Sequence, residues 1–408
     1  MAMPMTQVLT QDTALSWMPQ IELMPVLQRE VMDHYVNKTE ISKGWRLEIF
    51  DGRKELVLHF GWEEFVRVSP NQRYFTVARP VASPEGRTMA YDVELRHVSN
   101  SVLARGRMSS LGSDGQESHD EFVPADDGLS ILHVANLPFS GGLHFVFVKR
   151  QASRLVRQFE VDKSELAFWN SRLSYEPKQG MIVVSFTGRA AGSGVYQTYL
   201  QCYSPEGRLR WETVIDGQSV VSNIFISGFD GTIALVCRNM DTRTKNMFLL
   251  KKSGDLIQQF QVYSGGLYRI SYFYNVLGRQ YFLSCSDGEF FYVVDIQKGE
   301  IINDQDFCKY GGTTVTGIAS YKEYIIVSHC AFLWERGLNK YVVKDQGLGI
   351  ISLHTNNPML YLPLNLSGSP FIFYTEKGLF LRERISDYYG VEGYEKNDIN
   401  KFYKIILK

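Results

Sequence analysis

From Trp45 onwards, apolar residues alternate with polar ones or form short runs, and turn residues separate these runs. This pattern predicts β-strands rather than helices. The segments Arg46–Phe50 and Glu55–Phe60 lie on either side of Asp51-Gly52, a dipeptide that is a strong signal for a two-residue hairpin turn. A β-hairpin is therefore expected over residues 45–60.

The segment before Trp45 has a different period. Met24, Leu27, Val31 and Tyr35 follow one another at spacings of three, four and four residues, which places them on one face of a helix. Because Pro25 is tolerated only in a first helical turn, the helix is expected to begin near residue 25. Its apolar stripe either packs on the main domain or is offered to a partner.

Strand–turn–strand units then recur along the chain. Their turns are expected at Asn100, Ser153, Gly207, Gly254 and Gly299, at intervals of 53, 54, 47 and 45 residues. Two further strands precede each hairpin, so the repeat contains four strands. A repeat of roughly 45 residues with four strands is the signature of a β-propeller, in which stacked sheets bury each other's faces.

The repeats give an expected number of blades. Five complete units are expected over residues 63–108, 120–162, 169–216, 219–264 and 267–308. A sixth begins at TTVTGIAS and runs to about His354, and a last unit contains MLYLPLNL, PFIFYTEKG and GLFLRERI. A strand of the 45–60 hairpin is expected to complete this last unit and to remove its free edge. We predict an all-β fold, a β-propeller of seven four-stranded blades, with six and eight as the alternatives.

Three segments follow from this interpretation. Residues 1–44 are expected to be an N-terminal extension with an amphipathic helix, residues 45–385 the β-propeller, and residues 386–408 a C-terminal tail. The end of the tail, Lys401–Leu407, is expected to be a strand that locks the fold.

The repeats resemble those of WD-repeat and quinoprotein-like β-propellers. The resemblance is carried by YSPEGRLRWE (203–212) and VDIQKGEI (294–301), where a glycine turn precedes an outer strand. Only Trp211 occupies the tryptophan position of such strands. The Trp-Asp dipeptide of WD repeats is absent, and Trp62-Glu63, Trp211-Glu212 and Trp334-Glu335 are its nearest substitutes. The resemblance implies an architecture and carries no catalytic residues across.

Composition and charge narrow the function classes. The 408 residues contain 43 Lys and Arg against 44 Asp and Glu, so the net charge of -1 does not suit a protein that binds nucleic acid through bulk positive charge. No apolar run is long enough to cross a membrane, and the N-terminus lacks the features of a secretory signal. The five cysteines have no CxxC spacing and are expected to be reduced thiols in the core. A cytoplasmic location is expected.

Candidate chemical groups are scattered. Asp126, Asp127 and Asn136 together suggest calcium ligands, but Asp126-Asp127-Gly128 is more simply a tight turn. His133 and His144 lie in one expected blade and either face each other or serve packing. The glycines around Ser193 are not a nucleophile elbow, because no strand-to-helix turn is expected there. We therefore expect no catalytic, metal-binding or cofactor-binding residues and no cofactor.

The expected function is that of a non-catalytic scaffold that mediates protein–protein interaction, including as a subunit of a larger complex. The loops 109–119 and 187–194 and the N-terminal helix are the expected contact surfaces. A basic hairpin with Lys149, Arg150, Arg154 and Arg157 is either solvated or bound by an acidic partner. Neither a membrane nor nucleic acid is expected as a partner. The alternative is a hydrolase or lyase with its site at the mouth of a central channel.

Overall fold

The computed structural model describes residues 7–9, 21–31, 35–41, 43–51, 55–69, 71–82, 84, 88–111, 119–136, 144–162, 168–189, 196–215, 219–239, 245–262, 268–276, 279–286, 290–306, 314–335, 340–353, 360–375, 377–385 and 399–407. Within these residues the chain is all-β, apart from the four-residue helix α1 (Gln28–Val31). It divides into two compact units, Met1–Asp33 together with Gly265–Lys408, and His34–Ser264.

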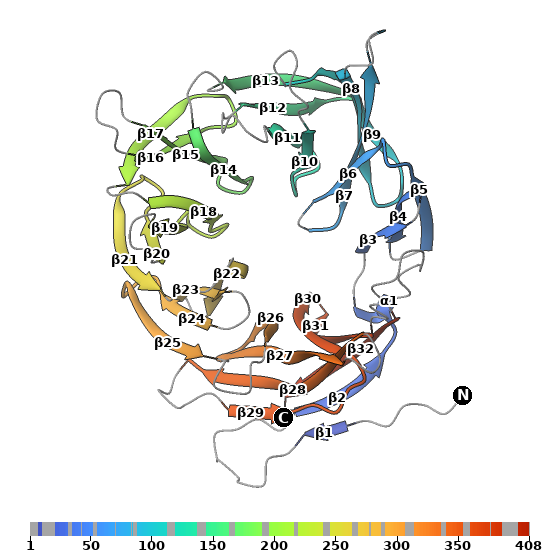
Figure 1. The fold of residues 1–408 in the computed structure, drawn as a ribbon, viewed down its shortest axis with the longest axis vertical. Coiled ribbons are helices and arrows are strands. Elements are labelled where there is room, and N and C mark those ends of the chain that lie inside the picture. Colours follow the sequence, from blue (N-terminus) through green and yellow to red (C-terminus); the bar gives the residue numbers. More distant parts are fainter. Residues whose placement is uncertain are drawn as a thin grey trace. The chain divides into compact units, whose positions relative to one another are not determined.

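The first unit contains three antiparallel sheets (Figure 1). Their strands are β1 (Gln7–Leu9), β2 (Ile21–Val26), β22 (Tyr268–Val276), β23 (Arg279–Ser286), β24 (Phe290–Asp295), β25 (Glu300–Asp306), β26 (Thr314–Tyr321), β27 (Tyr324–Glu335), β28 (Lys340–Ser352), β29 (Leu360–Pro363), β30 (Ser369–Thr375), β31 (Gly378–Ile385) and β32 (Ile399–Leu407). Two sheets, β22–β25 and β26–β29, follow the chain order, and the third has the order β1-β2-β32-β31-β30.

The second unit begins with a three-stranded sheet and continues in groups of four strands. Its strands are β3 (Tyr35–Ile41), β4 (Gly44–Phe50), β5 (Glu55–Phe60), β6 (Phe65–Val68), β7 (Tyr74–Ala82), β8 (Thr88–His97), β9 (Val102–Ser109), β10 (His119–Pro124), β11 (Ser130–Asn136), β12 (His144–Gln151), β13 (Arg154–Asp162), β14 (Phe168–Glu176), β15 (Met181–Arg189), β16 (Tyr196–Tyr203), β17 (Leu209–Ile215), β18 (Ser219–Ile226), β19 (Ile233–Asn239), β20 (Lys245–Leu250) and β21 (Leu256–Val262). The groups β6–β9 and β10–β13 share one eight-stranded sheet, because β9 pairs with β13.

The five predicted complete repeats are confirmed as the groups β6–β9, β10–β13, β14–β17, β18–β21 and β22–β25. Hydrophobic clusters lie between successive groups within each unit. Met181, Leu200 and Leu235, for example, belong to one cluster shared by the β14–β17 and β18–β21 groups. Each group thus buries apolar surface against its neighbour, as the repeat pattern predicts.

The predicted amphipathic N-terminal helix is not confirmed, because among the described residues only the four of α1 are helical. Residues 21–26 form strand β2, which pairs antiparallel with β32, so that Ile21 lies opposite Leu407 and Leu23 opposite Ile405. Alternate residues of a strand point to opposite faces. Ile21 and Leu23 are fully buried, whereas Met24 is exposed. The residues from Met24 to Tyr35 therefore belong to the end of β2, to α1 and to the start of β3. The pairing of β2 with β32 outweighs the helical spacing of the apolar residues.

The last blade is completed from both ends of the chain, but not by the predicted segment. The 45–60 hairpin pairs with β3 in a sheet of its own, while β2 joins β32. The expected C-terminal strand Lys401–Leu407 lies within β32. Pairing between the two ends covers an edge that β32 would otherwise leave open.

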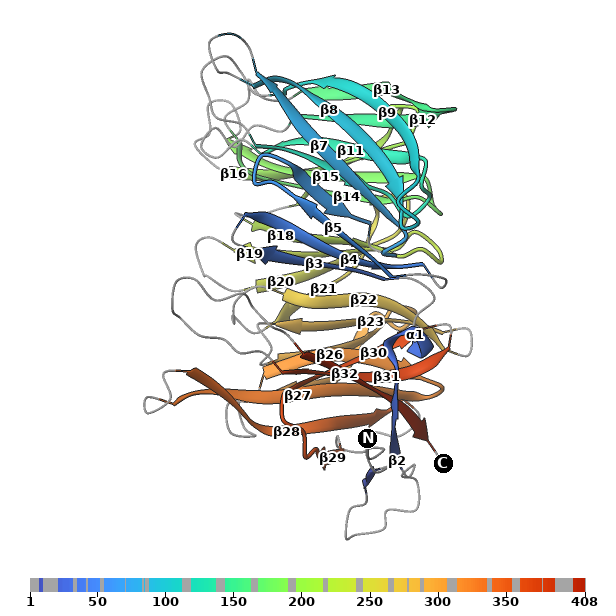
Figure 2. The ribbon, with the colours of Figure 1, turned by 90° about the vertical axis from the view of Figure 1, so that its right-hand side faces the viewer.

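The predicted count of seven blades is not confirmed. The described strands form eight groups when β6–β9 and β10–β13 are counted separately, because β3–β5 stands alone as a three-stranded sheet. The segment MLYLPLNL also belongs to the sixth repeat and not to the last, since β29 pairs with Gly347–Ile350 of β28. The strands β27 and β28 are unusually long, with 12 and 13 residues (Figure 2). The fourth strand of this repeat therefore begins later in the sequence than the repeat length predicts, and the sequence pattern assigns it to the next blade.

Two of the predicted glycine turns connect neighbouring groups. Gly254 has a φ of +90°, and a Cβ atom there would lie 2.8 Å from the Trp211 ring of the preceding group. The indole Nε1 of Trp211 donates a hydrogen bond to the Lys252 carbonyl at 2.8 Å. Gly207 packs in the same way on Phe159. A side chain at Gly254 would thus be disfavoured by the positive φ angle and would clash with the Trp211 ring.

We predict that Leu23→Ala lowers the free energy of unfolding of the first unit by about 2–5 kcal/mol, because it leaves a cavity in a closed apolar cluster. Equilibrium urea unfolding followed by circular dichroism measures the change. The matched control is Met24→Ala in the same strand, which removes an exposed side chain and is expected to cost less than about 1 kcal/mol. Equal effects of the two substitutions would contradict the observed strand.

Candidate functional site

The turns between the first and second strands of four successive groups in the second unit are linked to one another. We call the β6–β7, β10–β11, β14–β15 and β18–β19 turns the turn surface. The backbone N–H of Asn71 donates to Asp126 Oδ1 at 2.7 Å, and its side-chain amide donates to the Asp126 carbonyl at 3.0 Å. The Gln179 side-chain amide donates to the carbonyls of Gly228 and Phe229 at 3.0 and 3.1 Å. The β6–β7 turn is thus held to the β10–β11 turn, and the β14–β15 turn to the β18–β19 turn.

Among the described residues, Phe229 is the most exposed large apolar side chain, with 59% of its surface accessible. Its turn is nevertheless firmly held. The Phe229 N–H donates to Ser227 Oγ at 3.2 Å, and Asp230 accepts hydrogen bonds from the N–H and the hydroxyl of Thr232 at 2.9 and 2.8 Å. Lys252 Nζ fixes Gln179 by donating to its side-chain oxygen at 2.9 Å. An aromatic ring therefore faces solvent from a rigid support.

Three ionisable groups in or beside the turn surface have displaced pKa values. Burial raises the pKa of Asp126, and the charge of Asp127 adds to this effect, although the bond from Asn71 opposes it. Burial also raises the pKa of Glu176, with a further contribution from the charge of Asp126. Burial raises the pKa of Tyr175 to about 12. Two carboxyl groups with raised pKa values thus lie near each other, Asp126 in the β10–β11 turn and Glu176 at the end of β14.

The predicted tight turn at Asp126-Asp127-Gly128 is present. Asp127 Oδ1 accepts hydrogen bonds from the N–H groups of Leu129 and Ser130 at 2.7 and 2.8 Å, and Gly128 has a φ of +63°. The side chain of Asn136 lies outside the described residues. Across the described part of the chain, no group of three or more His, Cys, Asp or Glu side chains is placed to hold a metal ion.

The two histidines of the β10–β13 group bind different carboxylates. His133 Nε2 lies 3.0 Å from Asp120 Oδ2, and both side chains are buried. His144 Nε2 lies 2.5 Å from Glu160 Oε1. The backbone of Leu111 joins the two pairs, since its N–H donates to Asp120 at 2.9 Å and its carbonyl lies 3.1 Å from His144 Nδ1. The histidines therefore fix the end of β9 and do not form a shared site.

The described cysteines support the interpretation of buried thiols. Cys202, Cys237 and Cys330 are free and buried. Burial raises the pKa of Cys202 to about 11 and that of Cys330 to about 12. Thiols of this kind carry little thiolate at neutral pH and are poor nucleophiles.

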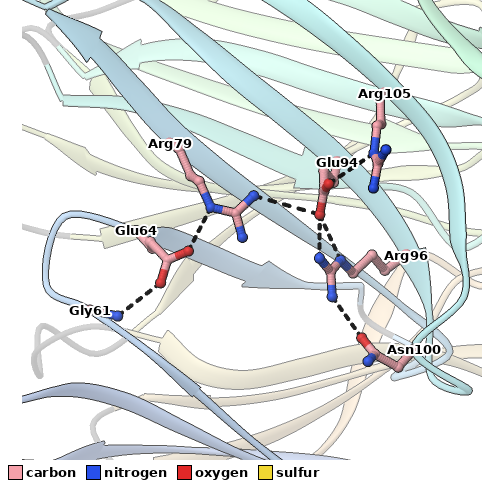
Figure 3. A network of polar contacts seen from close by, with 7 residues as sticks. All are labelled: Gly61, Glu64, Arg79, Glu94, Arg96, Asn100 and Arg105. Atoms are coloured by element: carbon pink, nitrogen blue, oxygen red, sulfur yellow. Dashed lines mark hydrogen bonds and ion pairs between the residues drawn. The ribbon is translucent and has the colours of Figure 1, made fainter.

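A second polar feature, which the sequence search missed, lies on one face of β7, β8 and β9 (Figure 3). Glu94 is shared by three arginines: Arg96 Nε lies 2.9 Å from it, Arg105 Nε 2.9 Å and Arg79 Nη1 3.6 Å. Arg79 also donates to Glu64 at 2.7 Å. The signal was available in the alternating charges of DVELRH (92–97) and LARGR (103–107), which face each other across an antiparallel pair.

The electrostatics of Glu94 follow from these neighbours. Burial alone would raise its pKa, but the hydrogen bond from Arg96 and the charges of Arg96, Arg79 and Arg105 together lower it. A carboxyl group with a lowered pKa in the folded state stabilises the protein above its unfolded-state pKa, and this contribution is lost as the pH falls through the folded-state value.

We predict that Glu94→Gln lowers the free energy of unfolding by about 1–2 kcal/mol at pH 7, because three arginines lose their shared anion. The difference from the wild type should shrink as the pH falls below 4.5, the ordinary pKa of a glutamate. Urea unfolding at several pH values measures it. Glu48→Gln, in an exposed pair with Arg46, is the control and is expected to cost less than about 0.5 kcal/mol. An effect independent of pH would refute the electrostatic explanation.

The basic hairpin noted in the sequence joins β12 to β13. Arg157 forms an ion pair with Glu160. Among the described residues, Lys149, Arg150 and Arg154 form no ion pair with a carboxylate. The unpaired positive charge of the hairpin is therefore carried by three of the four basic residues noted in the sequence. The hairpin lies beside β9, which pairs with β13.

The predicted contact surfaces are only partly visible. Most of the loops 109–119 and 187–194 lies outside the described residues, as do Ser193 and its flanking glycines. The predicted N-terminal helix is not confirmed as a contact surface, because β2 takes up its first residues within a sheet and, of the residues described there, only Gln28–Val31 is helical. Within the described chain, no helix is long and apolar enough to cross a membrane.

Comparisons with known proteins identify the fold. No protein-family model matches the chain, and no curated protein matches it at a significant level. The structure is similar to dihydro-heme d1 dehydrogenase NirN in complex with DHE, with a TM-score of 0.51 and 15% identity over 98% of this chain and 79% of that chain. Another match is the Dos1 propeller, with a TM-score of 0.47 and 8% identity over 83% of this chain and 90% of that chain. The C-terminal WD40 domain of Sif2 also matches, with a TM-score of 0.45 and 10% identity over 95% of this chain and 93% of that chain.

The repeated four-stranded groups and the match to NirN define the class of protein. The chain is an all-β protein with the architecture of a β-propeller. At 15% identity the likeness extends to the fold alone.

Proposed function

We propose that the protein is a non-catalytic β-propeller scaffold that binds a protein partner through the turn surface, including as a subunit of a larger complex. The observation that carries the proposal is Phe229, an exposed aromatic ring on a turn that hydrogen bonds already hold in place. Aromatic residues dominate the energetics of protein interfaces. A rigid support lowers the ordering cost of binding.

Leu129 supports the same proposal. It is 44% exposed in the β10–β11 turn, so a second apolar side chain belongs to the turn surface. The acidic groups Asp126, in the same turn, and Glu176, at the end of β14, would form the polar rim that protein interfaces have around an apolar centre. Loops on a rigid scaffold are the usual sites of recognition. A cytoplasmic location is part of the proposal and rests on the sequence alone.

The test is affinity purification from the source cells, with the full chain as bait and quantitative mass spectrometry as readout. We expect at least one protein to co-purify with the wild type and to decline at least fivefold with Phe229→Ala, since loss of an interface aromatic typically removes more than 1 kcal/mol. Leu256→Ala is the matched control, because Leu256 is 56% exposed on another strand of the same group. If the wild type, Phe229→Ala and Leu256→Ala retained the same partners in equal amounts, the turn surface would be excluded as the partner-binding site.

A hydrolase or lyase is the second candidate, and the pair Asp126 and Glu176 is the observation that favours it. Carboxyl groups with raised pKa values are typical of general acids. In this protein both carboxylates also accept backbone hydrogen bonds, Asp126 from Asn71 and Glu176 from Lys178, so a purely structural role accounts for them as well.

The two explanations differ in one measurement. Chromogenic ester, glycoside and polyuronate substrates are incubated with the wild type and with the Asp126→Asn/Glu176→Gln double variant. The scaffold proposal predicts no turnover above the blank for either protein. Turnover by the wild type that the double variant loses, while its unfolding transition is unchanged, would establish the enzyme instead.

A further inference from the structure

The outermost strands of two neighbouring groups meet at a single point. β9 and β13 run parallel and pair through Arg105 and Arg154, and the Arg105 N–H donates to the Ser153 carbonyl at 3.0 Å. In Figure 2 the strands β7, β8, β9 and β13 follow one another at the top of the view. Elsewhere in the described chain, neighbouring groups do not share strand pairing.

The core side of this junction is closely packed. A Cβ atom on Gly106 would lie 2.8 Å from the Leu155 side chain, so only a glycine lets the two strands approach. Leu155 is buried in the cluster between the two groups. Because successive side chains of a strand point to opposite faces, Arg105 and Arg154 point away from this core.

Two cations are therefore held side by side on the outer surface. The Arg105 side chain is 69% exposed and shares its counter-ion, Glu94, with two other arginines. Arg154 is exposed and forms no ion pair among the described residues. Two residues further along β9, Arg107 binds Asp92 through two hydrogen bonds of 2.7 and 2.8 Å. We call Arg105, Arg107 and Arg154 the arginine seam.

The charge of the seam is not balanced by its neighbours. The arginine seam and the adjoining Arg79 and Arg96 present five guanidinium groups, against the three carboxylates Glu64, Asp92 and Glu94. Lys149 and Arg150, on the strand next to β13, add positive charge, and among the described residues neither forms an ion pair. The charge of Lys149 is partly offset by Glu206, whose pKa it helps to lower. Backbone pairing thus keeps two residues of like charge opposite each other, which favours a ligand that supplies carboxylates.

The geometry points to a docking site for an acidic segment of a partner protein along the arginine seam. Guanidinium groups bind carboxylates through paired hydrogen bonds, as Arg107 already binds Asp92. An extended chain repeats its side chains on one face at about 7 Å, which suits arginines two residues apart on β9. This site is separate from the turn surface and goes beyond the proposed function.

The test is fluorescence anisotropy with a labelled peptide of ten glutamates and the purified full chain, at 20 and 150 mM salt. We expect saturable binding that weakens at the higher salt, because exposed charges are screened. Arg154→Gln should weaken binding about tenfold, and Arg105→Gln/Arg154→Gln further, since each removes a charge-assisted contact. Arg208→Gln, at the equivalent turn of the next group, removes the same charge and should change affinity less than twofold.

Hydrogen–deuterium exchange and two binding controls show where the peptide binds and whether the ligand class is correct. Hydrogen–deuterium exchange of the unmodified chain should show slower exchange in β9 and β13 when the peptide is present. No saturable binding, equal losses with Arg208→Gln, or protection elsewhere would overturn the site. Tighter binding of a single-stranded oligonucleotide that the same variants abolish would overturn the assignment to an acidic protein. Phe229→Ala should leave peptide affinity unchanged, so failure here is distinguishable from failure of the proposed function.

Discussion

Burial of both faces of each small sheet against its neighbours is the constraint on which this structure depends. A group of four strands with apolar residues on both faces cannot bury them alone. Stacking of successive groups buries these faces, and it produces the hydrophobic clusters that lie between them. The requirement reaches the last sheet of the first unit as well, where Ile21 and Leu23 enter a cluster built mainly from residues beyond position 318. The N-terminal strand is therefore part of the core.

The same constraint explains which features the sequence made predictable. Turn chemistry is local, so the turns at Gly207 and Gly254 follow directly from the residues present. Strand pairing between distant segments is not local. Nothing near Leu23 shows that its partner is Ile405, almost at the other end of the chain, and the helical spacing around it is misleading. The long strands β27 and β28 likewise moved the segment MLYLPLNL into a different blade from the predicted one.

The candidate sites were less predictable than the fold. Phe229 lies in SGFDGT, which shows an ordinary turn in sequence, and only the hydrogen bonds from Gln179 in the neighbouring group reveal its rigid support. The arginine seam likewise depends on the contact between β9 and β13, which lie about 50 residues apart in sequence. Both features arise between groups, and the sequence pattern describes each group by itself. A stable stack leaves such junctions and turns free to differ, which is how one scaffold serves different partners.

Hydrogen–deuterium exchange along β2 tests the central claim most directly, because it reports whether the N-terminal strand belongs to the core of the native chain. The structure predicts that amides of β2 that donate to β32 exchange as slowly as those of β31, on the other side of β32. Exchange of the whole of 21–26 at the rate of an unstructured peptide, with β31 still protected, would show that the last sheet closes without the N-terminal strand and would contradict the account.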